Sequence, residues 1–294
     1  MALEIAGIIP AMVTPLDENE EIDVSGLRRL VNYLIEAGVH GLFPMGSQGE
    51  FYAFSPEEKA RVWRIVVEET RGRVPVYAGT GAPATRQVIE LNRLAEQAGV
   101  DAVSITTPFF IHPSQDELCQ HYIEIAEATR LPVLLYNNPA RTGSSISPDL
   151  AARLSRHPNI VGIKDSGGDL TLTIEMVRQS EPDFAVLMGR DSLIYAALHH
   201  GVRGAIAATA SVVPKLVVEI YEAYRSGDMA AALAAQERLH PLRLAFSLGT
   251  FPVVVKDALN MIGIPVGPPR RPVRPLSGEA RETLRAVLHE MGAL

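Results

Sequence analysis

Eight short apolar runs recur along the 294-residue chain, and each is followed by a stretch with the residue spacing of an amphipathic helix. This alternation is typical of βα units on a parallel sheet. The predicted strands are GIIPAMVTP from Gly7, GLFPMG from Gly41, VPVYAGTG from Val74, DAVSITTPFF from Asp101, PVLLYNNP from Pro132, IVGIKDS from Ile160, FAVLMGRD from Phe184 and GAIAATAS from Gly204. Eight repeats fit a closed barrel better than a doubly wound open sheet, although spacing alone does not exclude the open sheet. We therefore predict an α/β fold of the (β/α)8 TIM barrel type.

The chain changes character beyond Asp228, where strand-like runs stop. Three helices are predicted there, at about 229–248, 252–262 and 278–292, with the Pro-rich connector GIPVGPPRRPVRPLS between the last two. Earlier, Ser55 and Ser114 each precede an acidic residue by three positions, which predicts that they cap the helices after the second and fourth strands. We predict a catalytic barrel over 1–228 and a C-terminal helical extension over 229–294, which could cover the barrel or form a subunit interface.

The charge of the chain argues against a polyanionic partner. The formal net charge is −7 and the isoelectric point is about 5.7, whereas binding to nucleic acid or an anionic membrane needs clustered Lys and Arg. Hydrophobic residues make up 47% of the chain, enough for a large core. We therefore expect a globular protein that binds a small molecule, with no nucleic-acid partner and no membrane partner.

The cysteine content and the N-terminal segment bear on cellular location. Cys119 is the only cysteine, so neither an intramolecular disulfide nor a Cys-based zinc site can form. The start, MALEIAGIIPAMVTP, lacks a basic segment ahead of an apolar core, and no apolar run reaches the roughly 18 residues of a membrane helix. We expect a cytoplasmic protein.

Lys164 ends the sixth predicted strand and is one of only four lysines among 27 basic residues. Period-two alternation places Ile160, Gly162 and Lys164 on one face of this strand. If that face lines the barrel, burial lowers the pKa of the ammonium and frees the amine to attack a ketone and form an imine. The alternatives are a solvated lysine at the strand end and a buried ion pair with a carboxylate such as Asp165.

Tyr136 ends the fifth predicted strand, which neighbours the sixth in a barrel. Because Leu134 and Tyr136 share a face by the same alternation, the phenol can point inward beside Lys164. A tyrosine next to an imine can serve as general acid and base. The alternative is a barrel tyrosine whose hydroxyl caps a backbone carbonyl.

The loop GSQGE, from Gly46 to Glu50, follows the second predicted strand. Glycines let the backbone turn so that consecutive N–H groups point at one spot, which suits a carboxylate, and Ser47 adds a hydroxyl. As a bare turn, the same loop would need no ligand.

Four motifs, GSQGEF, TPFF, YNNPARTG and GIKDSGGD, occur in this order at the predicted strand ends. With them the chain resembles, over essentially its whole length, the dihydrodipicolinate synthase and N-acetylneuraminate lyase family of class I aldolases. The resemblance implies a barrel enzyme that forms an imine with pyruvate or a related 2-oxo acid, joins it to or splits it from an aldehyde, and needs no metal or other cofactor. It also implies a homotetramer or homodimer.

The resemblance assigns roles to residues at matching positions of this sequence. Lys164 matches the imine-forming lysine, and Tyr136 matches the proton-shuttling tyrosine. Ser47 and Gln48 fall where the family binds the 2-oxo acid carboxylate and positions a hydroxyl for the proton relay. In the synthases of this family, the loop is Gly-Thr-Thr-Gly-Glu, so Gln48 departs from the synthase pattern.

Three further positions bear on the substrate. Arg141 matches the arginine that binds a substrate carboxylate in the dihydrodipicolinate synthases, and Ile206 matches a position whose backbone contacts bound pyruvate. Phe110 stands where the synthases place a tyrosine that joins the relay across a dimer interface, and a phenylalanine cannot pass a proton. Its neighbour Phe109 lacks a hydroxyl as well.

The motifs and their departures from the synthase pattern predict an aldolase reaction. We predict reversible aldol cleavage or condensation of pyruvate and an aldehyde, of the 2-keto-3-deoxy acid or 4-hydroxy-2-oxoglutarate aldolase type. The alternative is 4-hydroxy-tetrahydrodipicolinate synthase, which condenses pyruvate with aspartate semialdehyde. A non-catalytic barrel that binds a 2-oxo acid is a competitor of another class. A metal-dependent aldolase is disfavoured because the eight histidines form no paired ligand set at the strand ends.

Overall fold

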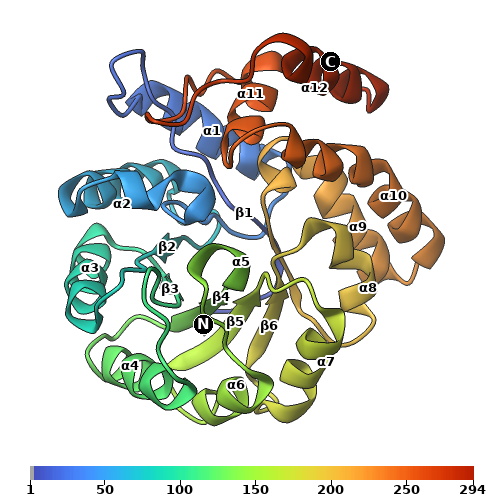
Figure 1. Cartoon of the computed structure of the whole chain (residues 1–294). Helices are drawn as coiled ribbons and strands as arrows, with labels where there is room; N and C mark the ends of the chain where they lie inside the picture. The colour runs from blue at the N-terminus through green and yellow to red at the C-terminus, as the bar shows by residue number, and fades with distance from the viewer. Residues whose placement is uncertain (1–2) are drawn as a thin grey trace.

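The computed structural model of the chain describes residues 3–294 and contains a curled, fully parallel sheet ringed by helices (Figure 1). The seven strands are β1 Gly7–Pro10, β2 Tyr77–Gly79, β3 Ala102–Thr106, β4 Val133–Asn137, β5 Ile160–Asp165, β6 Ala185–Met188 and β7 Gly204–Ala207. Their order in the sheet is β1-β7-β6-β5-β4-β3-β2, so each strand lies beside its neighbour in the chain except across the gap between β1 and β2.

The second predicted strand fills that gap as a pair of single bridges. Phe43 pairs with Ala11 beside β1, and Leu42 pairs with Val76 beside β2, both in parallel. The Phe43 N–H donates to the carbonyl of the residue before Ala11 at 3.1 Å, and this segment thereby closes the ring. Pro44 follows directly and has no N–H with which to continue a ladder, which explains why no longer strand forms. The predicted closed barrel is confirmed.

The helices follow the strands in the predicted alternation (Figure 1). They are α1 Val24–Glu36, α2 Pro56–Thr70, α3 Thr85–Ala98, α4 Gln115–Glu127, the short α5 Pro139–Thr142, α6 Pro148–Leu154, α7 Leu170–Gln179, α8 Ile194–Leu198 and α9 Pro214–Ser226. Ser55 and Ser114 cap α2 and α4 as predicted, each in a reciprocal capping box with a glutamate three residues later. No helix among residues 3–294 is long and apolar enough to cross a membrane.

The alternation along β5 holds only at its C-terminal end. Lys164 points into the barrel and Ile163 packs outward against the helices, as predicted. Ile160 also packs outward, so the prediction that it shares a face with Lys164 is wrong. The cause is a register shift between β4 and β5, which leaves Val161 without a partner and turned toward the inner cluster. A bulge of one residue moves every side chain before it to the other face.

The three predicted C-terminal helices are present, as α10 Met229–Ala245, α11 Val253–Met261 and α12 Gly278–Glu290. Figure 1 shows α10 alongside α9, with α11 and α12 continuing over the same side of the barrel. A short 3-10 turn, Phe246–Leu248, follows α10 and lies at the mouth of the barrel cavity. The extension therefore contributes to the cavity wall in addition to packing on the barrel.

A buried ion pair ties the Gly46–Glu50 loop to this extension. The Lys256 Nζ in α11 lies 2.7 Å from the Glu50 Oε1, and both side chains are fully buried. Lys256 also donates to the Pro268 carbonyl at 2.7 Å, and the Arg270 N–H donates to Glu50 at 2.8 Å. The charges of Lys256 and Glu50 compensate one another, so removing either side chain leaves the other charge buried and unpaired.

We expect Lys256→Met, which roughly preserves side-chain length, to lower the free energy of unfolding by about 3–5 kcal/mol, because Glu50 is left as an isolated buried charge. Chemical denaturation measures this loss. The exposed control Lys215→Met should change stability by less than about 0.5 kcal/mol. The double variant Glu50→Gln/Lys256→Met should recover part of the loss, and a single variant as stable as its control would contradict the argument.

Candidate active site

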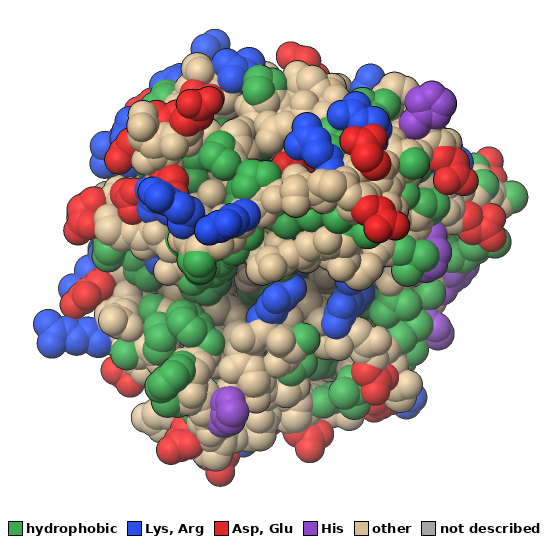
Figure 2. Space-filling model, turned by 45° about the horizontal axis from the view of Figure 1, so that its top comes forward, with side chains coloured by type: hydrophobic (Ala, Val, Ile, Leu, Met, Phe, Trp, Pro, Cys, Tyr) green, Lys and Arg blue, Asp and Glu red, His purple; other side chains and the backbone are tan. Residues whose placement is uncertain are grey.

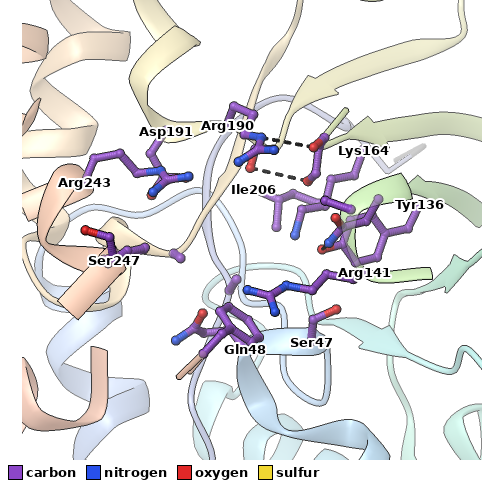
Figure 3. A pocket seen from close by; sticks show the side chains of 18 residues that line it. Ser47, Gln48, Tyr136, Arg141, Lys164, Arg190, Asp191, Ile206, Arg243 and Ser247 are labelled. Carbon is purple, nitrogen blue, oxygen red and sulfur yellow. Dashed lines mark hydrogen bonds between the residues drawn. The ribbon is translucent and has the colours of Figure 1, made fainter. Parts of the chain in front are cut away.

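The six residues that we predicted to react with or bind the substrate all line one cavity, of about 470 Å³, at the carboxyl ends of the strands. This volume lies within the roughly 300–1,000 Å³ range of small-molecule sites. The cavity is lined by Ala11, Ser47, Gln48, Tyr136, Asn138, Ala140, Arg141, Lys164, Ser166, Gly189, Arg190, Asp191, Ile206, Ala208, Arg243, Phe246, Ser247 and Phe251. Figure 3 shows Lys164 and Tyr136 side by side, with Ser47 and Gln48 below them and Arg190 above.

Lys164 is buried at 4% exposure between aromatic rings. Its Nζ lies 4.2 Å from the centre of the Tyr136 ring and 5.0 Å from that of Phe43. Neither predicted alternative occurs, because the amine is not solvated and Asp165 is engaged elsewhere. The Asp165 carboxylate accepts from Thr173 at 2.6 Å and from other donors on the far side of the strand. The amine is therefore buried beside two aromatic rings and has no paired carboxylate among residues 3–294.

Tyr136 lies directly opposite Lys164 in the register of β4 and β5. Its hydroxyl accepts a hydrogen bond from the Asn138 amide at 2.9 Å and does not cap a backbone carbonyl. Burial by itself raises the pKa of this phenol, whereas the positive charge of Lys164 lowers it. Hydrogen bonds with Ser47, Asn138 and Ser166 lower the pKa further, and the net result lies below the ordinary value of 10.0. A lowered pKa brings the phenol closer to the range in which it can both donate and, as phenolate, accept a proton.

The Gly46–Glu50 loop forms a tight 3-10 turn under the cavity. Gly46 is required there, because a Cβ atom would lie 2.5 Å from the Phe43 ring. Gln48 is 2% exposed, and its amide nitrogen donates weakly to the Pro252 carbonyl at 3.4 Å. The Gln48 Oε1 has no hydrogen-bond partner among the described residues, although it is buried. Such an acceptor is suited to a hydroxyl or ammonium of a bound ligand.

Arg141 and Ile206 reach the cavity from different elements. Arg141 belongs to the short helix α5, and its guanidinium carbon lies 4.4 Å above the Phe251 ring. Phe251 comes from the segment before α11, so the extension helps to hold this arginine. Ile206 lies in β7 at 1% exposure, and its side chain belongs to the inner apolar cluster.

Several cavity residues escaped the sequence analysis. Ser166, Arg190 and Asp191 directly follow β5 and β6, so the rule that barrel sites lie just beyond strand ends could have found them. Arg243 and Phe251 come from the helical extension, where no strand-end rule applies. Only the packing of α10 against the barrel brings them to the cavity.

Phe110 does not line the cavity. It is 95% exposed and has a left-handed backbone with φ of 75°. Its neighbour Phe109 packs on Phe51, with ring centres 5.7 Å apart. Within one chain, the position at which the synthases place their second tyrosine therefore lies on the surface.

Comparison with known proteins gives one family over nearly the whole chain. The model of the dihydrodipicolinate synthetase family matches residues 4–291. The chain belongs to this family. The family inferred from the four motifs is thus confirmed, and so is the barrel fold.

Individual relatives are similar over their full length. A 4-hydroxy-tetrahydrodipicolinate synthase of Methanopyrus kandleri is 41% identical, covering 100% of this chain and 99% of the relative. The crystal structure of dihydrodipicolinate synthase DapA-2 from Bacillus anthracis is 39% identical, with a TM-score of 0.95 and 98% of both chains covered. YagE, a prophage protein of the dihydrodipicolinic acid synthase family from E. coli K12 in complex with pyruvate, is 33% identical, with a TM-score of 0.96 and 99% of both chains covered.

Family membership establishes the reaction class. The chain is a class I lyase, of the kind that forms a lysine imine with pyruvate and uses no metal. Pyruvate and an aldehyde are the substrates of the family. Among the specific assignments, the names of the relatives support our alternative, the synthase, better than the 2-keto-3-deoxy acid or 4-hydroxy-2-oxoglutarate aldolase that we preferred from the sequence.

The geometry around Tyr136 yields a prediction that separates imine formation from turnover. If Tyr136 is the acid and base that the sequence predicts, Tyr136→Phe should lower kcat by about 10²–10⁴-fold. Borohydride trapping followed by mass spectrometry should still find pyruvate attached to Lys164. Tyr33→Phe is a matched control, since the Tyr33 hydroxyl donates to the Val212 carbonyl outside the cavity. A kcat for Tyr136→Phe within twofold of the control would exclude this role.

Proposed function

We propose that Lys164 forms the imine and that Tyr136 is its acid and base. The observation that carries this proposal is the pair itself, a buried amine 4.2 Å from the ring of a phenol with a lowered pKa. Ser47 and Gln48 would hold the pyruvate carboxylate, and the backbone of Ile206 would contact the bound pyruvate. All of them line the same cavity, which supports this division of roles.

The reaction follows from these roles. The Lys164 amine adds to the ketone carbon of pyruvate, and loss of water leaves a protonated imine. Loss of a proton from the methyl carbon C3 gives an enamine, whose electron pair forms the C3–C4 bond with the aldehyde carbon. The aldehyde oxygen takes its proton from Tyr136. Cleavage runs through the same steps in reverse and releases the aldehyde and pyruvate.

Aspartate semialdehyde is our proposal for the aldehyde, which makes the protein a 4-hydroxy-tetrahydrodipicolinate synthase. Relatives of that name, 41% and 39% identical over nearly the full chain, support it. Arg141 supports it as well, since a guanidinium suits a substrate carboxylate. After the carbon–carbon bond forms, the amino group of the aldehyde would attack the imine carbon, close the ring and free Lys164.

A second candidate function is cleavage of a 2-keto-3-deoxy acid or of 4-hydroxy-2-oxoglutarate. Two observations favour it. The buried Gln48 Oε1 has no partner among residues 3–294 and could accept from a hydroxyl of such a substrate. Phe110 lacks the hydroxyl that the synthases use at this position. Gln48 and Phe110 would alter the proton relay, whereas the proposed pair of Lys164 and Tyr136 is the same in both candidate functions.

We further propose that the protein assembles as a homotetramer or homodimer. Tyr52, Phe110 and Ile111 are large apolar side chains at 52%, 95% and 52% exposure, and such exposed groups are typical of contact surfaces. Light scattering on the purified protein tests this, and a monomer at micromolar concentration would contradict it.

An aldehyde panel tests the function. Pyruvate is offered with aspartate semialdehyde, glyoxylate or D-glyceraldehyde, and kcat/KM is compared. We expect the highest value for aspartate semialdehyde, whereas preference for glyoxylate or glyceraldehyde would replace this assignment with the second candidate. Borohydride trapping of pyruvate alone tests the imine, with Lys59→Arg as a control outside the cavity. Absence of an adduct on Lys164 at saturating pyruvate would sink both candidates.

The place of Arg141 in the cavity leads to a prediction about the aldehyde. Arg141→Ala should lower kcat/KM for aspartate semialdehyde by about 10- to 150-fold, the effect of losing a charge-assisted hydrogen bond. The concentration of pyruvate needed for half-maximal trapping should stay the same. The exposed Arg130, outside the cavity, is the control as Arg130→Ala. An equal rise in the pyruvate concentration needed for half-maximal trapping would indicate that Arg141 binds pyruvate and not the aldehyde.

A further inference from the structure

Two consecutive asparagines follow Tyr136 at the end of β4, and their surroundings differ. Asn137 is bonded to the barrel wall, because its Nδ2 donates to Asp165 at 2.8 Å and its Oδ1 accepts from the Ile146 N–H at 3.0 Å. Asn138 lies on the inner side with Tyr136 and lines the cavity. Figure 2 shows this cavity from outside, as a hollow with basic side chains at its edge. Asn138 has no role in the reaction steps described above.

The backbone of Asn138 is held by several hydrogen bonds. Its carbonyl oxygen accepts from the Arg141 N–H at 2.9 Å, from the Thr142 N–H at 3.1 Å and from the Thr142 hydroxyl at 3.2 Å. Asn138 is the residue that precedes the first turn of α5, and Pro139 directly after it restricts its backbone further. The side-chain amide of Asn138 therefore extends from a fixed backbone.

Three side chains form hydrogen bonds with the phenol oxygen of Tyr136, namely those of Ser47, Asn138 and Ser166. The two serine hydroxyls can donate or accept, because their hydrogens rotate. The Ser166 hydroxyl donates to the Gly189 carbonyl at 3.3 Å, which leaves its oxygen to accept from the phenol. The Asn138 Nδ2 can only donate, and it donates to the phenol oxygen at 2.9 Å. In the bond with Asn138, the phenol oxygen is therefore always the acceptor.

A donor that cannot reverse favours one protonation state of its partner. When Tyr136 ionises, the bond from Asn138 becomes charge-assisted, and such bonds are roughly twice as strong as neutral ones. The bond therefore stabilises the phenolate more than the phenol. The Lys164 Nζ lies 4.2 Å from the centre of the Tyr136 ring, so a proton acceptor held in this way is next to the site of the proposed imine. Because the donor is already in place, it needs no rearrangement during the reaction.

We propose that Asn138 is a positioning residue that holds the Tyr136 oxygen as a proton acceptor, so that the phenolate removes the proton from C3 of the imine. This inference rests on the imine proposed at Lys164. The proton taken from C3 stays on the phenol and passes to the aldehyde oxygen when the carbon–carbon bond forms, which restores the phenolate. Asn138 itself neither gains nor loses a proton.

The test measures the removal of the C3 proton directly, as exchange of the pyruvate methyl protons for deuterium in D2O, followed by NMR. Pyruvate is the only substrate and the full-length protein is used, so the result does not depend on the aldehyde. Rates are compared between about pH 6 and pH 10, after subtraction of the rate without protein. In the unmodified protein, exchange should become faster as pH rises and Tyr136 ionises.

Asn138→Leu has nearly the size of asparagine but no donor. Its pH profile should move about one to two pH units toward alkaline pH, because the phenolate loses one charge-assisted hydrogen bond and the pKa of the phenol rises. Near pH 7 the exchange rate should fall by about 10- to 100-fold, and the deficit should shrink as pH is raised. A purely structural role would instead lower the rate by the same factor at every pH, and that result overturns the proposal.

Asn138→Asp keeps the shape of asparagine but presents a negatively charged acceptor to the phenol. Because this charge opposes ionisation of Tyr136, we expect a larger shift than in Asn138→Leu. A profile equal to that of the unmodified protein would mean that the amide accepts from the phenol, which also overturns the proposal. Should Asn138→Leu not fold, Asn138→Asp decides alone.

The control is Asn19→Leu, since Asn19 is exposed and lies outside the cavity; it should leave the profile unchanged. Borohydride trapping of pyruvate is measured in every variant, and a trapped adduct shows that Lys164 still reacts. A trapped adduct in the unmodified protein without deuterium exchange overturns the role of the phenolate, and with it that of Asn138. The absence of an adduct on Lys164 in the unmodified protein overturns the imine proposal itself.

Discussion

The burial of one amine without a counter-charge is the constraint on which the rest of the site depends. Lys164 lies between the Tyr136 and Phe43 rings, and the adjacent carboxylate of Asp165 is held away by Thr173 and Asn137. A carboxylate beside the amine would stabilise the ammonium and suppress attack on a ketone. Aromatic faces surround the amine instead, and no carboxylate is paired with it among residues 3–294. The Tyr136 phenol lies beside the amine, and the charge of Lys164 and hydrogen bonds lower the pKa of this phenol in spite of its burial.

The part of this arrangement that follows from local periodicity could be predicted from the sequence. The side chains of a strand alternate between the inside and the outside of the barrel, and this rule predicted that Lys164 and Tyr136 both point inward from neighbouring strands. In the structure the two residues are directly paired in the register of β4 and β5. The same rule failed for Ile160, because a bulge at Val161 interrupts the period. Gly162, next to Val161, is a weak local signal, because a glycine within a strand often accompanies a bulge, but the shift itself is set by how β5 fits against β4.

The second half of the site could not be predicted in this way. Arg243 and Phe251 belong to the extension, where helical periodicity indicates a buried face but not which neighbour that face meets. Their position depends on α10 packing against α9 and on the Lys256–Glu50 pair, which joins α11 to the loop of Ser47 and Gln48. A contact between residues two hundred positions apart has no local signature. For the same reason, the residue types at Gln48 and Phe110 do not by themselves identify the aldehyde substrate.

The two parts of the cavity differ in how freely their residues can be substituted. Lys164 and Tyr136 sit on paired strands of the barrel, where a shift of one side chain would disturb the closed ring of β-strands. The three arginines of the cavity sit on a short helix, a loop and the extension, where substitutions meet fewer packing constraints. Pyruvate chemistry can therefore stay constant while the charge around the aldehyde changes. In this chain Arg141, Arg190 and Arg243 line the cavity beside a single acidic residue, Asp191, so this part of the cavity favours a ligand that brings negative charge.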